Sequence, residues 1–573
     1  YVMRARALYY MGYYSDGYED CERALERFPY ELGAYVFKVK ILIEVGQFDM
    51  ADEILAYLEG EDLAGSELEF LKGFVLEARG EQEEAWAIYE NIVNRHADRE
   101  KNIFDVQNLA EVYHHMAVLK YGSKGATYSQ VDELIDKGLA EDPRFVYLLE
   151  MRAETAGERK QYKKALETYL KVEEIAPGRI GIYGAIDNLL REQNQWDRAL
   201  EYAEKQLQQL PTGYNFMRRG QLFAYMNRNE DAEADFKKAM HLAPDLSYPY
   251  NYMGVLVESY GDEEQALELY KKAIEVGERE NDVCMEAYHN AANILCRQGQ
   301  LVSARMTLSR GYNLIPDKTL LYEEFLVARR EGEFDDAEEL LKQFAQINTD
   351  ANSAVKFMVD MASICRERGD MDKALGLYKP LVERSSEAGL EVGKILLYKG
   401  FYREAVDYIT DAIEVYREEC KREKKPSGIN GPELTNDDNL FLLSEYYLWG
   451  ARAALEGGFI EEAHQMALDG LYLIPDNYDK FESCMPMVEQ MRGGLNTILG
   501  NYELAEECLQ RALTARKCDY CTHGYCIDAC FEMIYLCLLT GRREEALEYL
   551  RKGIEVDPID TDFRNMKERL LGK

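Results

Sequence analysis

The sequence predicts an all-α protein built as a solenoid of antiparallel helix pairs. Three observations support this prediction: only 13 of the 573 residues are proline, 42 are tyrosine among long Ala-, Leu- and Glu-rich stretches, and one short pattern recurs along the chain. Sparse proline favours helices, because proline breaks a helix interior. A recurring pattern favours a single stacked array over separate compact domains, since each unit buries its apolar face only against its neighbours.

Each copy of the pattern starts at a turn residue and continues through small and aromatic positions. In one clear copy, Asn227 is followed by Ala232, Phe236, Ala239 and Pro244. The turn residue suits the left-handed backbone of a helix end. Alanine fits where two helices come closest, the aromatic side chain fills the gap toward the next unit, and proline ends the second helix. The pattern therefore predicts two antiparallel helices in each copy.

Fifteen copies are predicted in order along the chain, and many turns are 34 residues apart, as Gly12 is from Gly46. The turns fall at Gly12, Gly46, Gly80, near Ala126, and at Lys160, Asn194, Asn227, Gly261, Gly299, Gly332, Gly369, Gly400, Gly458, Gly500 and Gly541. Longer steps follow Gly80, Gly400, Gly458 and Gly500, which indicates inserted loops there. After Pro558, residues 562–571 predict one amphipathic helix that caps the last apolar face.

The longest interruption suggests a division of the array. Residues 421–439 are polar and contain Pro426 and Gly428, as expected for a loop. We therefore predict a first array over 1–420, a boundary loop over 421–439, further repeats over 440–558 with a cysteine-rich insertion at 518–526, and a capping helix within 559–573. The basic cluster that opens the loop is interpreted either as a solvated helix end or as a docking point for an acidic partner.

Charge and cysteine content limit the class of protein. With 68 Lys+Arg against 105 Asp+Glu, the net charge is −37, which argues against nucleic acid and against an anionic membrane surface as partner. No apolar run is long enough to cross a bilayer, so no membrane insertion is expected. Scattered cysteines in helical patterns indicate a reducing, cytoplasmic setting. Because the chain starts at Tyr1 within a repeat, the sequence is expected to continue upstream.

One cysteine cluster could carry chemistry. Cys518, Cys521, His523 and Cys526 have the ligand types and spacing of a structural zinc site. The alternatives are ordinary free thiols or, less in keeping with the helical context, a redox Cys-x-x-Cys pair. No motif of a nucleotide-binding loop, a nucleophile elbow or a paired-histidine metalloprotease is found, which predicts a protein without catalytic activity and without a cofactor beyond that zinc.

The recurring pattern strongly resembles the tetratricopeptide repeat family over essentially the whole chain. The resemblance implies a right-handed superhelix in which the first helices of the pairs line a concave groove, so the groove would hold a peptide segment or a partner protein. Mapped onto the central repeats, the groove residues are Tyr214, Met217, Arg218, Gln221, Tyr248, Asn251, Tyr252, His289, Asn290 and Asn293. The Lys and Asn clamp of chaperone-binding members is missing from the corresponding positions, which predicts a different ligand.

These observations predict a non-catalytic scaffold or adaptor for protein partners. The negative charge favours a partner of basic character. Two alternatives stay open: the chain is the client-recruiting arm of a larger enzyme or co-chaperone, such as a J-domain fusion with its active domain upstream of Tyr1, or it is a zinc-stabilised regulatory module.

Overall fold

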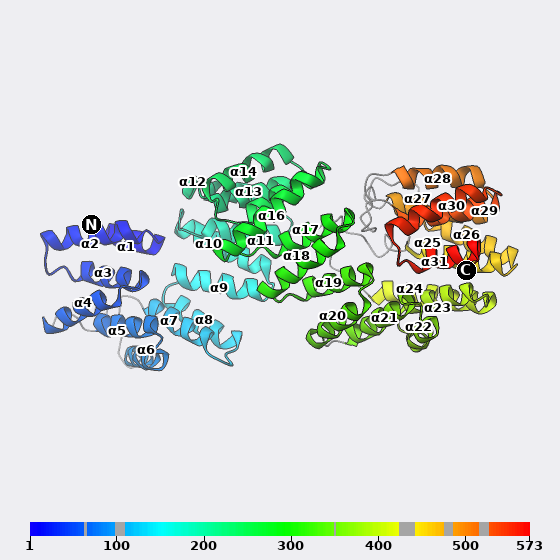
Figure 1. Ribbon diagram of the computed structural model, residues 1–573. Coiled ribbons are helices and arrows are strands. Elements are labelled where there is room, and N and C mark those ends of the chain that lie inside the picture. Colours follow the sequence, from blue (N-terminus) through cyan, green and yellow to red (C-terminus); the bar gives the residue numbers. More distant parts are fainter. Residues whose placement is uncertain are drawn as a thin grey trace. The chain divides into compact units, whose positions relative to one another are not determined.

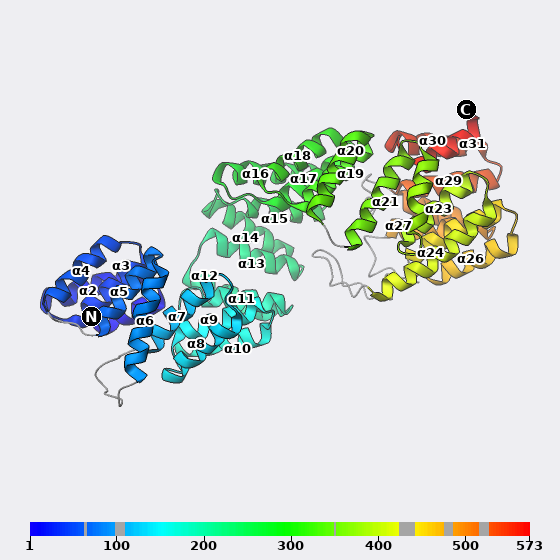
Figure 2. The same ribbon diagram turned by 90° about the horizontal axis from the view of Figure 1, so that it is seen from below.

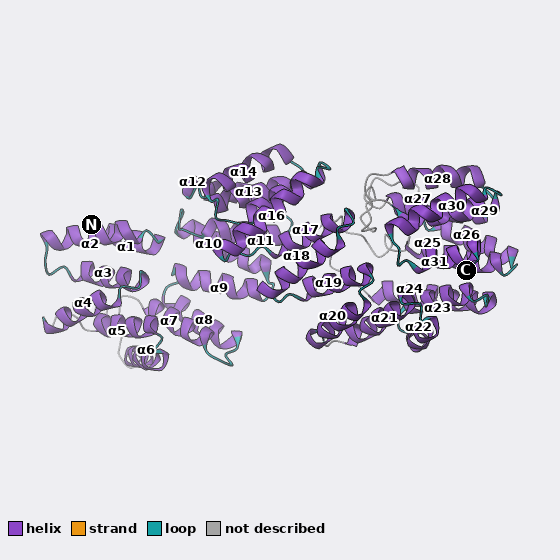
Figure 3. Cartoon of the chain, in the orientation of Figure 1, coloured by secondary structure: helices purple, strands orange, loops and turns teal. Residues whose placement is uncertain are grey.

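The computed structural model describes residues 1–61, 66–97, 109–348, 351–422, 442–474, 485–514 and 526–572. Within these ranges the regular elements are 31 α-helices and one short 3-10 helix, Lys379–Leu381 (Figure 3). Helices α1 to α30 form fifteen successive antiparallel pairs and α31 stands alone (Figure 1). The predicted all-α repeat architecture is thus confirmed. No described helix combines the length and the apolar run needed to cross a bilayer.

The chain divides into two compact units, Tyr1–Pro244 and Asp245–Lys573, and each is described by itself. The first unit contains α1 (Val2–Met11), α2 (Tyr14–Arg27), α3 (Leu32–Glu44), α4 (Phe48–Gly60), α5 (Ser66–Arg79), α6 (Gln82–Ala97), α7 (Leu109–Gly122), α8 (Tyr128–Glu141), α9 (Val146–Glu158), α10 (Tyr162–Ile175), α11 (Ile182–Glu192), α12 (Trp196–Gln209), α13 (Gly213–Tyr225) and α14 (Asn229–Leu242).

The second unit contains α15 (Tyr248–Ser259), α16 (Glu263–Glu280), α17 (Met285–Arg297), α18 (Leu301–Leu314), α19 (Lys318–Glu331), α20 (Phe334–Ile347), α21 (Ala351–Glu367), α22 (Met371–Tyr378), α23 (Ser386–Tyr398), α24 (Tyr402–Arg422), α25 (Leu443–Glu456), α26 (Ile460–Tyr472), α27 (Met485–Ile498), α28 (Tyr502–Thr514), α29 (Ile527–Leu539), α30 (Arg543–Val556) and α31 (Thr561–Leu571). The helix expected over 562–571 is α31. Residues 423–439 of the predicted boundary loop lie outside the described residues, and α24 and α25 on either side pack against each other.

The turn between the two helices of each pair has a left-handed residue. All fourteen turn residues named from the sequence have positive φ, and the turn expected near Ala126 is made by Gly125, at φ 87°. Most are glycine, which adopts this conformation without steric cost. Three turn residues have this conformation although they are not glycine: Lys160 at φ 58°, Asn194 at φ 55° and Asn227 at φ 56°. The turn pattern in the sequence was therefore sufficient to locate every pair.

Small residues allow the helices of a pair to approach closely. The predicted contact residues Ala165, Ala232 and Ala266 have no exposed surface. At Gly220 a Cβ atom would lie 2.7 Å from the ring of Phe236, so only glycine lets that ring reach the backbone of α13. Between pairs, the first helices contact each other, as α1 does α3, α25 does α27, and α27 does α29. These contacts place the first helices on the inner side of the array.

Aromatic side chains fill the inner side of the first unit. The ring centre of Tyr10 on α1 lies 6.4 Å from that of Phe145 and 5.9 Å from that of Tyr147 in the first turn of α9. Arg179 stacks 4.4 Å from the Tyr147 ring centre and donates to the backbone oxygen of Tyr10. Farther along, the rings of Phe74 and His115 are 4.5 Å apart. The unit therefore covers this part of its inner surface with its own side chains.

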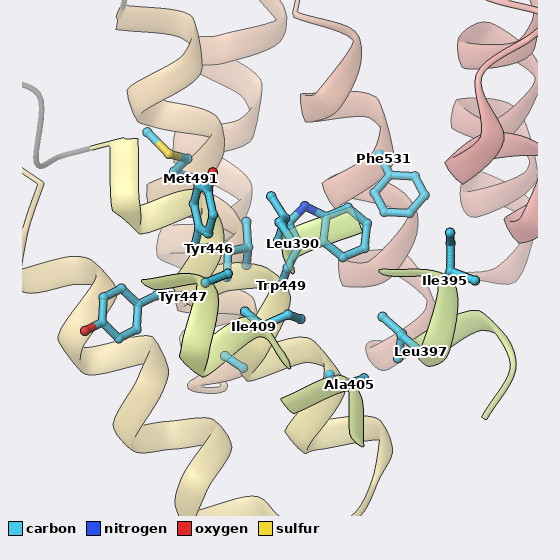
Figure 4. Close-up of a cluster of buried hydrophobic side chains, with 14 of the residues drawn as sticks. Leu390, Ile395, Leu397, Ala405, Ile409, Tyr446, Tyr447, Trp449, Met491 and Phe531 are labelled. Carbon is cyan, nitrogen blue, oxygen red and sulfur yellow. The ribbon is translucent and has the colours of Figure 1, made fainter. Parts of the chain in front are cut away.

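Helix α31 covers the inner side of the last pairs in the second unit. It packs on α30 (Figure 2), and Tyr398 at the end of α23 donates a 2.9 Å hydrogen bond to Asp562. Arg564 donates to the backbone oxygen of Glu367 at 2.6 Å, and the Phe563 ring lies 5.5 Å from that of Phe531. Phe531 belongs to the buried cluster of Figure 4. Helix α31 thus joins segments nearly 200 residues apart in sequence, where the sequence predicted only an end cap.

Candidate functional site

The predicted groove residues lie on first helices of both units. Tyr214, Met217, Arg218 and Gln221 are on α13 of the first unit, and the other six are on α15 and α17 of the second. The ten residues therefore form two separate faces, one on α13 of the first unit and one on α15 and α17 of the second unit. The larger one comprises Tyr248, Asn251, Tyr252, His289, Asn290 and Asn293, together with Glu323 of α19, and is called the polar face below.

On α13, an ion-pair network fixes the side chain of Arg218, one of the predicted groove residues. Arg218 lies 2.7 Å from Asp187, a carboxylate with no exposed surface, and also contacts Asn188. Arg191 binds the same carboxylate at 2.8 Å and donates to the backbone oxygen of Arg218 at 2.7 Å. Burial lowers the pKa of Arg191. Arg218 therefore has a structural partner inside the unit, while Tyr214 is half exposed and Met217 is buried.

The polar face contains two sets of hydrogen bonds, one between α15 and α17 and one between α17 and α19. Asn290 on α17 donates to the side-chain oxygen of Asn251 on α15 at 3.1 Å. On the same helix, Asn293 lies 2.9 Å from Nε2 of His289, whose Nδ1 contacts Glu323 of α19. Asn251 is buried and accepts the hydrogen bond from Asn290, whereas His289, Asn290 and Asn293 are half-buried. Carboxamides offer both donors and an acceptor, which suits a peptide backbone.

Tyrosines border these hydrogen-bonded side chains. Tyr248 and Tyr252, one turn apart on α15, are both half-buried, and their ring centres are 6.4 Å apart. Burial and nearby acidic groups raise the pKa of Tyr248 to about 12, so it stays a neutral hydroxyl near pH 7. Rigid tyrosines beside adaptable amides are typical of protein-binding surfaces. The arrangement can hold an extended segment by stacking and hydrogen bonding.

Acidic residues surround the face. Glu286 in the first turn of α17 is exposed, and Glu323 on α19 contacts His289. The nearby cation Arg297 is already paired, at 2.6 Å with Glu258 and 2.7 Å with Glu263. The sequence-based mapping missed Glu323, although its place on the first helix of the next repeat was a signal that could have identified it.

We expect His289 to titrate above the ordinary histidine range. Its hydrogen bond to Glu323 raises its pKa and outweighs burial, which acts in the opposite direction. The neutral ring accepts at Nε2 from Asn293 and carries its proton on Nδ1; protonation adds a hydrogen at Nε2, so Asn293 must turn its amide oxygen toward the ring. Because the pKa of His289 is higher in the folded chain than in the unfolded chain, its protonation stabilises the folded state, fully so at pH values below the unfolded-state pKa of about 6.5. This contribution is lost as pH rises through the folded pKa.

An NMR titration of the histidine ring carbons tests this expectation. Glu323→Gln should lower the pKa of His289, because the carboxylate that favours the protonated ring is removed. Glu264→Gln, an exposed change on α16, should leave that pKa where it is. An unchanged pKa in Glu323→Gln would show that the carboxylate does not act on His289.

The predicted zinc site falls mainly outside the described residues. Cys518, Cys521 and His523 are not described, and that part of the prediction stays a prediction. Cys526 opens α29, is 1% exposed, and packs in an apolar cluster with Ala505 and Met533. Cys530 and Cys537 are buried in α29. Within the described ranges, no group of three or more His, Cys, Asp or Glu is placed to hold a metal ion.

One helix pair matches a known repeat family. The sequence profile of the tetratricopeptide repeat family matches residues 528–560, the segment of α29 and α30. No curated protein sequence matches the chain. Among solved structures, MamA from Desulfovibrio magneticus RS-1 is 16% identical, with a TM-score of 0.28, covering 30% of this chain and 97% of that one. The C-terminal part of a TPR repeat-containing protein from Cytophaga hutchinsonii is 20% identical, with a TM-score of 0.34, covering 44% and 97%.

Proposed function

We propose that this chain is a non-catalytic adaptor that binds an extended, basic segment of a partner protein on the polar face, in keeping with the tetratricopeptide repeat that its residues 528–560 match. The observation that carries the proposal is a contrast along the inner side of the array. On α1, α5, α7 and α9 of the first unit the inner positions hold packed aromatic rings, and in the last pairs of the second unit they are covered by α31. On α15 and α17 the equivalent side chains are polar and half-exposed.

Charge supports a basic partner. Glu286 and Glu323 lie on the helices of the polar face, while the nearby guanidinium of Arg297 is neutralised by two carboxylates. Together with the net charge of −37, this arrangement attracts cations and repels acidic segments. The rate of association is therefore expected to fall as salt is added, since the attraction is screened within about 10 Å at 0.1 M ionic strength.

A peptide selection tests the docking face. A displayed random peptide library selected on the full chain should enrich Lys- and Arg-containing sequences. Tyr252→Ala/Asn290→Ala should weaken the selected peptides by about 2–4 kcal/mol, because it removes one aromatic contact and one hydrogen-bonding amide. The matched control is Met306→Ala, which truncates a 69% exposed side chain on the second helix α18 and should leave binding intact. Equal binding by both variants would place the binding surface elsewhere.

A further inference from the structure

A second open part of the inner side lies on the first helices α11 and α13 of the first unit. Tyr214 is 51% exposed and Asn188 is also exposed, whereas Arg191, Arg218 and Gln221 are half-buried. These five residues are called the arginine face below. The inference drawn from it rests on contacts within the first unit and does not depend on the polar face.

Two guanidinium groups share one buried carboxylate on this face. Asp187 has no exposed surface, and its two oxygens lie 2.8 and 3.0 Å from Nε of Arg191. Nη2 of Arg218 lies 2.7 Å from the same carboxylate and also contacts Asn188. Among the described residues neither arginine forms an ion pair with another carboxylate, so one positive charge is left over.

The surplus charge is held in an unfavourable place. Only 12% of the Arg191 side chain is exposed. Burial lowers the pKa of Arg191 and the neighbouring Arg218 adds to that effect, although Asp187 acts in the opposite direction. The next arginine on α13, Arg219, pairs with a carboxylate of its own, Asp235, at 2.7 Å. A second guanidinium is therefore not needed to neutralise Asp187, and charges held against their preference are concentrated at functional sites.

Several nitrogens of the two guanidinium groups are open to a ligand. Arg191 binds Asp187 through Nε, and its Nη2 donates to the backbone oxygen of Arg218 at 2.7 Å, which leaves Nη1. Arg218 makes its side-chain contacts through Nη2, which leaves Nε and Nη1. None of these three nitrogens is among the enclosed and unpartnered atoms of the described residues, so each of them has surface that a ligand can reach.

The surplus charge selects the kind of ligand. A guanidinium donates paired N–H groups that match the two oxygens of a carboxylate. A carboxylate also brings one negative charge, which balances the surplus, while water supplies acceptors without that charge. A phosphate carries up to two negative charges, which exceeds the surplus beside Asp187. The exposed ring of Tyr214, one turn before Arg218 on α13, provides apolar contact next to the charge.

We propose that the arginine face binds an acidic side chain, aspartate or glutamate, of a partner polypeptide. The carboxylate accepts from the open nitrogens of Arg191 and Arg218, and the adjoining part of the partner lies against Tyr214. Gln221, about one turn after Arg218, offers a carboxamide to the partner's backbone. The arginine face and the polar face thus prefer opposite charges, which allows an experiment to separate them.

A displayed random peptide library selected on the full chain tests this proposal. Each selected clone is measured against Arg218→Gln and against Tyr252→Ala/Asn290→Ala. Clones that Arg218→Gln weakens about tenfold or more, and that the polar-face variant binds unchanged, should contain Asp or Glu. Arg218→Gln leaves Asp187 paired with Arg191, so its melting temperature should stay close to that of the unchanged protein.

A double-mutant cycle identifies the contact. Replacing the acidic residue of such a clone with its amide should weaken binding to the unchanged protein about tenfold, and should have little further effect on binding to Arg218→Gln. Lys238→Gln, which removes an exposed cation from the second helix α14, should bind the clones as the unchanged protein does.

Four results would overturn the proposal. They are that no clone depends on Arg218, that the dependent clones lack Asp and Glu, that the amide replacement weakens binding to the unchanged protein and to Arg218→Gln alike, and that Lys238→Gln weakens the clones as much as Arg218→Gln does. None of these results bears on the polar face, whose ligands are recognised by their loss in Tyr252→Ala/Asn290→Ala.

Discussion

Replacing Glu532 with alanine is expected to remove about 3–5 kcal/mol from the free energy of unfolding of the second unit. The reason is that Arg452 and Glu532 are 2% and 3% exposed, so the remaining guanidinium would be a buried charge without its anion. Burial alone would lower the pKa of Arg452, but the carboxylate of Glu532 raises it above its ordinary value. Breaking such a pair costs far more than the pair itself contributes.

Tryptophan fluorescence can isolate this unit. The chain has three tryptophans, and Trp86 and Trp196 belong to the first unit. In a Trp86→Phe/Trp196→Phe background, Trp449 alone reports urea unfolding, and the unfolding midpoint of Glu532→Ala should fall accordingly. Removal of both charges in Arg452→Met/Glu532→Leu should recover part of the loss, since no unpaired charge remains.

An exposed carboxylate provides the control for this measurement. Glu503→Ala on α28 removes the same kind of charge at the surface and should cost less than about 1 kcal/mol. If Glu532→Ala lost no more than Glu503→Ala, the Arg452–Glu532 pair would be shown to make no buried contribution.

Truncating Phe563 to alanine is expected to release α31 from the inner side of the last pairs. Phe563 is 1% exposed and packs on the Phe531 ring and against Gly553, where a Cβ atom would lie 2.0 Å from the Phe563 ring. A buried Phe→Ala change costs about 3–5 kcal/mol. The other contacts of α31 include Asp562 with Tyr398, Arg564 with the Glu367 carbonyl, and Arg569 with Glu456, each a polar contact of about 2 kcal/mol or less.

Hydrogen exchange on the full chain measures this release. In Phe563→Ala the amides of α31 should exchange many times faster, and those at the end of α21 should also lose protection because Arg564 leaves Glu367. Leu571→Ala, at a 58% exposed position on the same helix, should exchange like the unchanged protein. Full protection of α31 in Phe563→Ala would mean that the polar contacts are sufficient to dock it.

Much of the fold followed from local sequence. A left-handed residue at each turn and, in thirteen of the fifteen copies, an alanine five residues later sufficed to locate the helix pairs. The conformation of a turn and the closest approach of two neighbouring helices depend on residues near in sequence. The resemblance to the tetratricopeptide repeat family placed the candidate groove on the first helices, and His289, Asn290 and Asn293 lie half-exposed on one of them.

Only the tertiary structure decided which inner surfaces are covered and which are left to a partner. Tyr398 meets Asp562 across 164 residues, and Arg452 meets Glu532 across 80. Such contacts depend on the curvature of the array, which accumulates from small rotations between successive pairs. No single repeat encodes the sum of these rotations, so the sequence by itself determined only the repeating unit. The packing of all the units together determined that α31 covers the last pairs and that the polar face of α15 and α17 remains half-exposed. The same packing leaves Arg452 with an unpaired nitrogen beside a cavity.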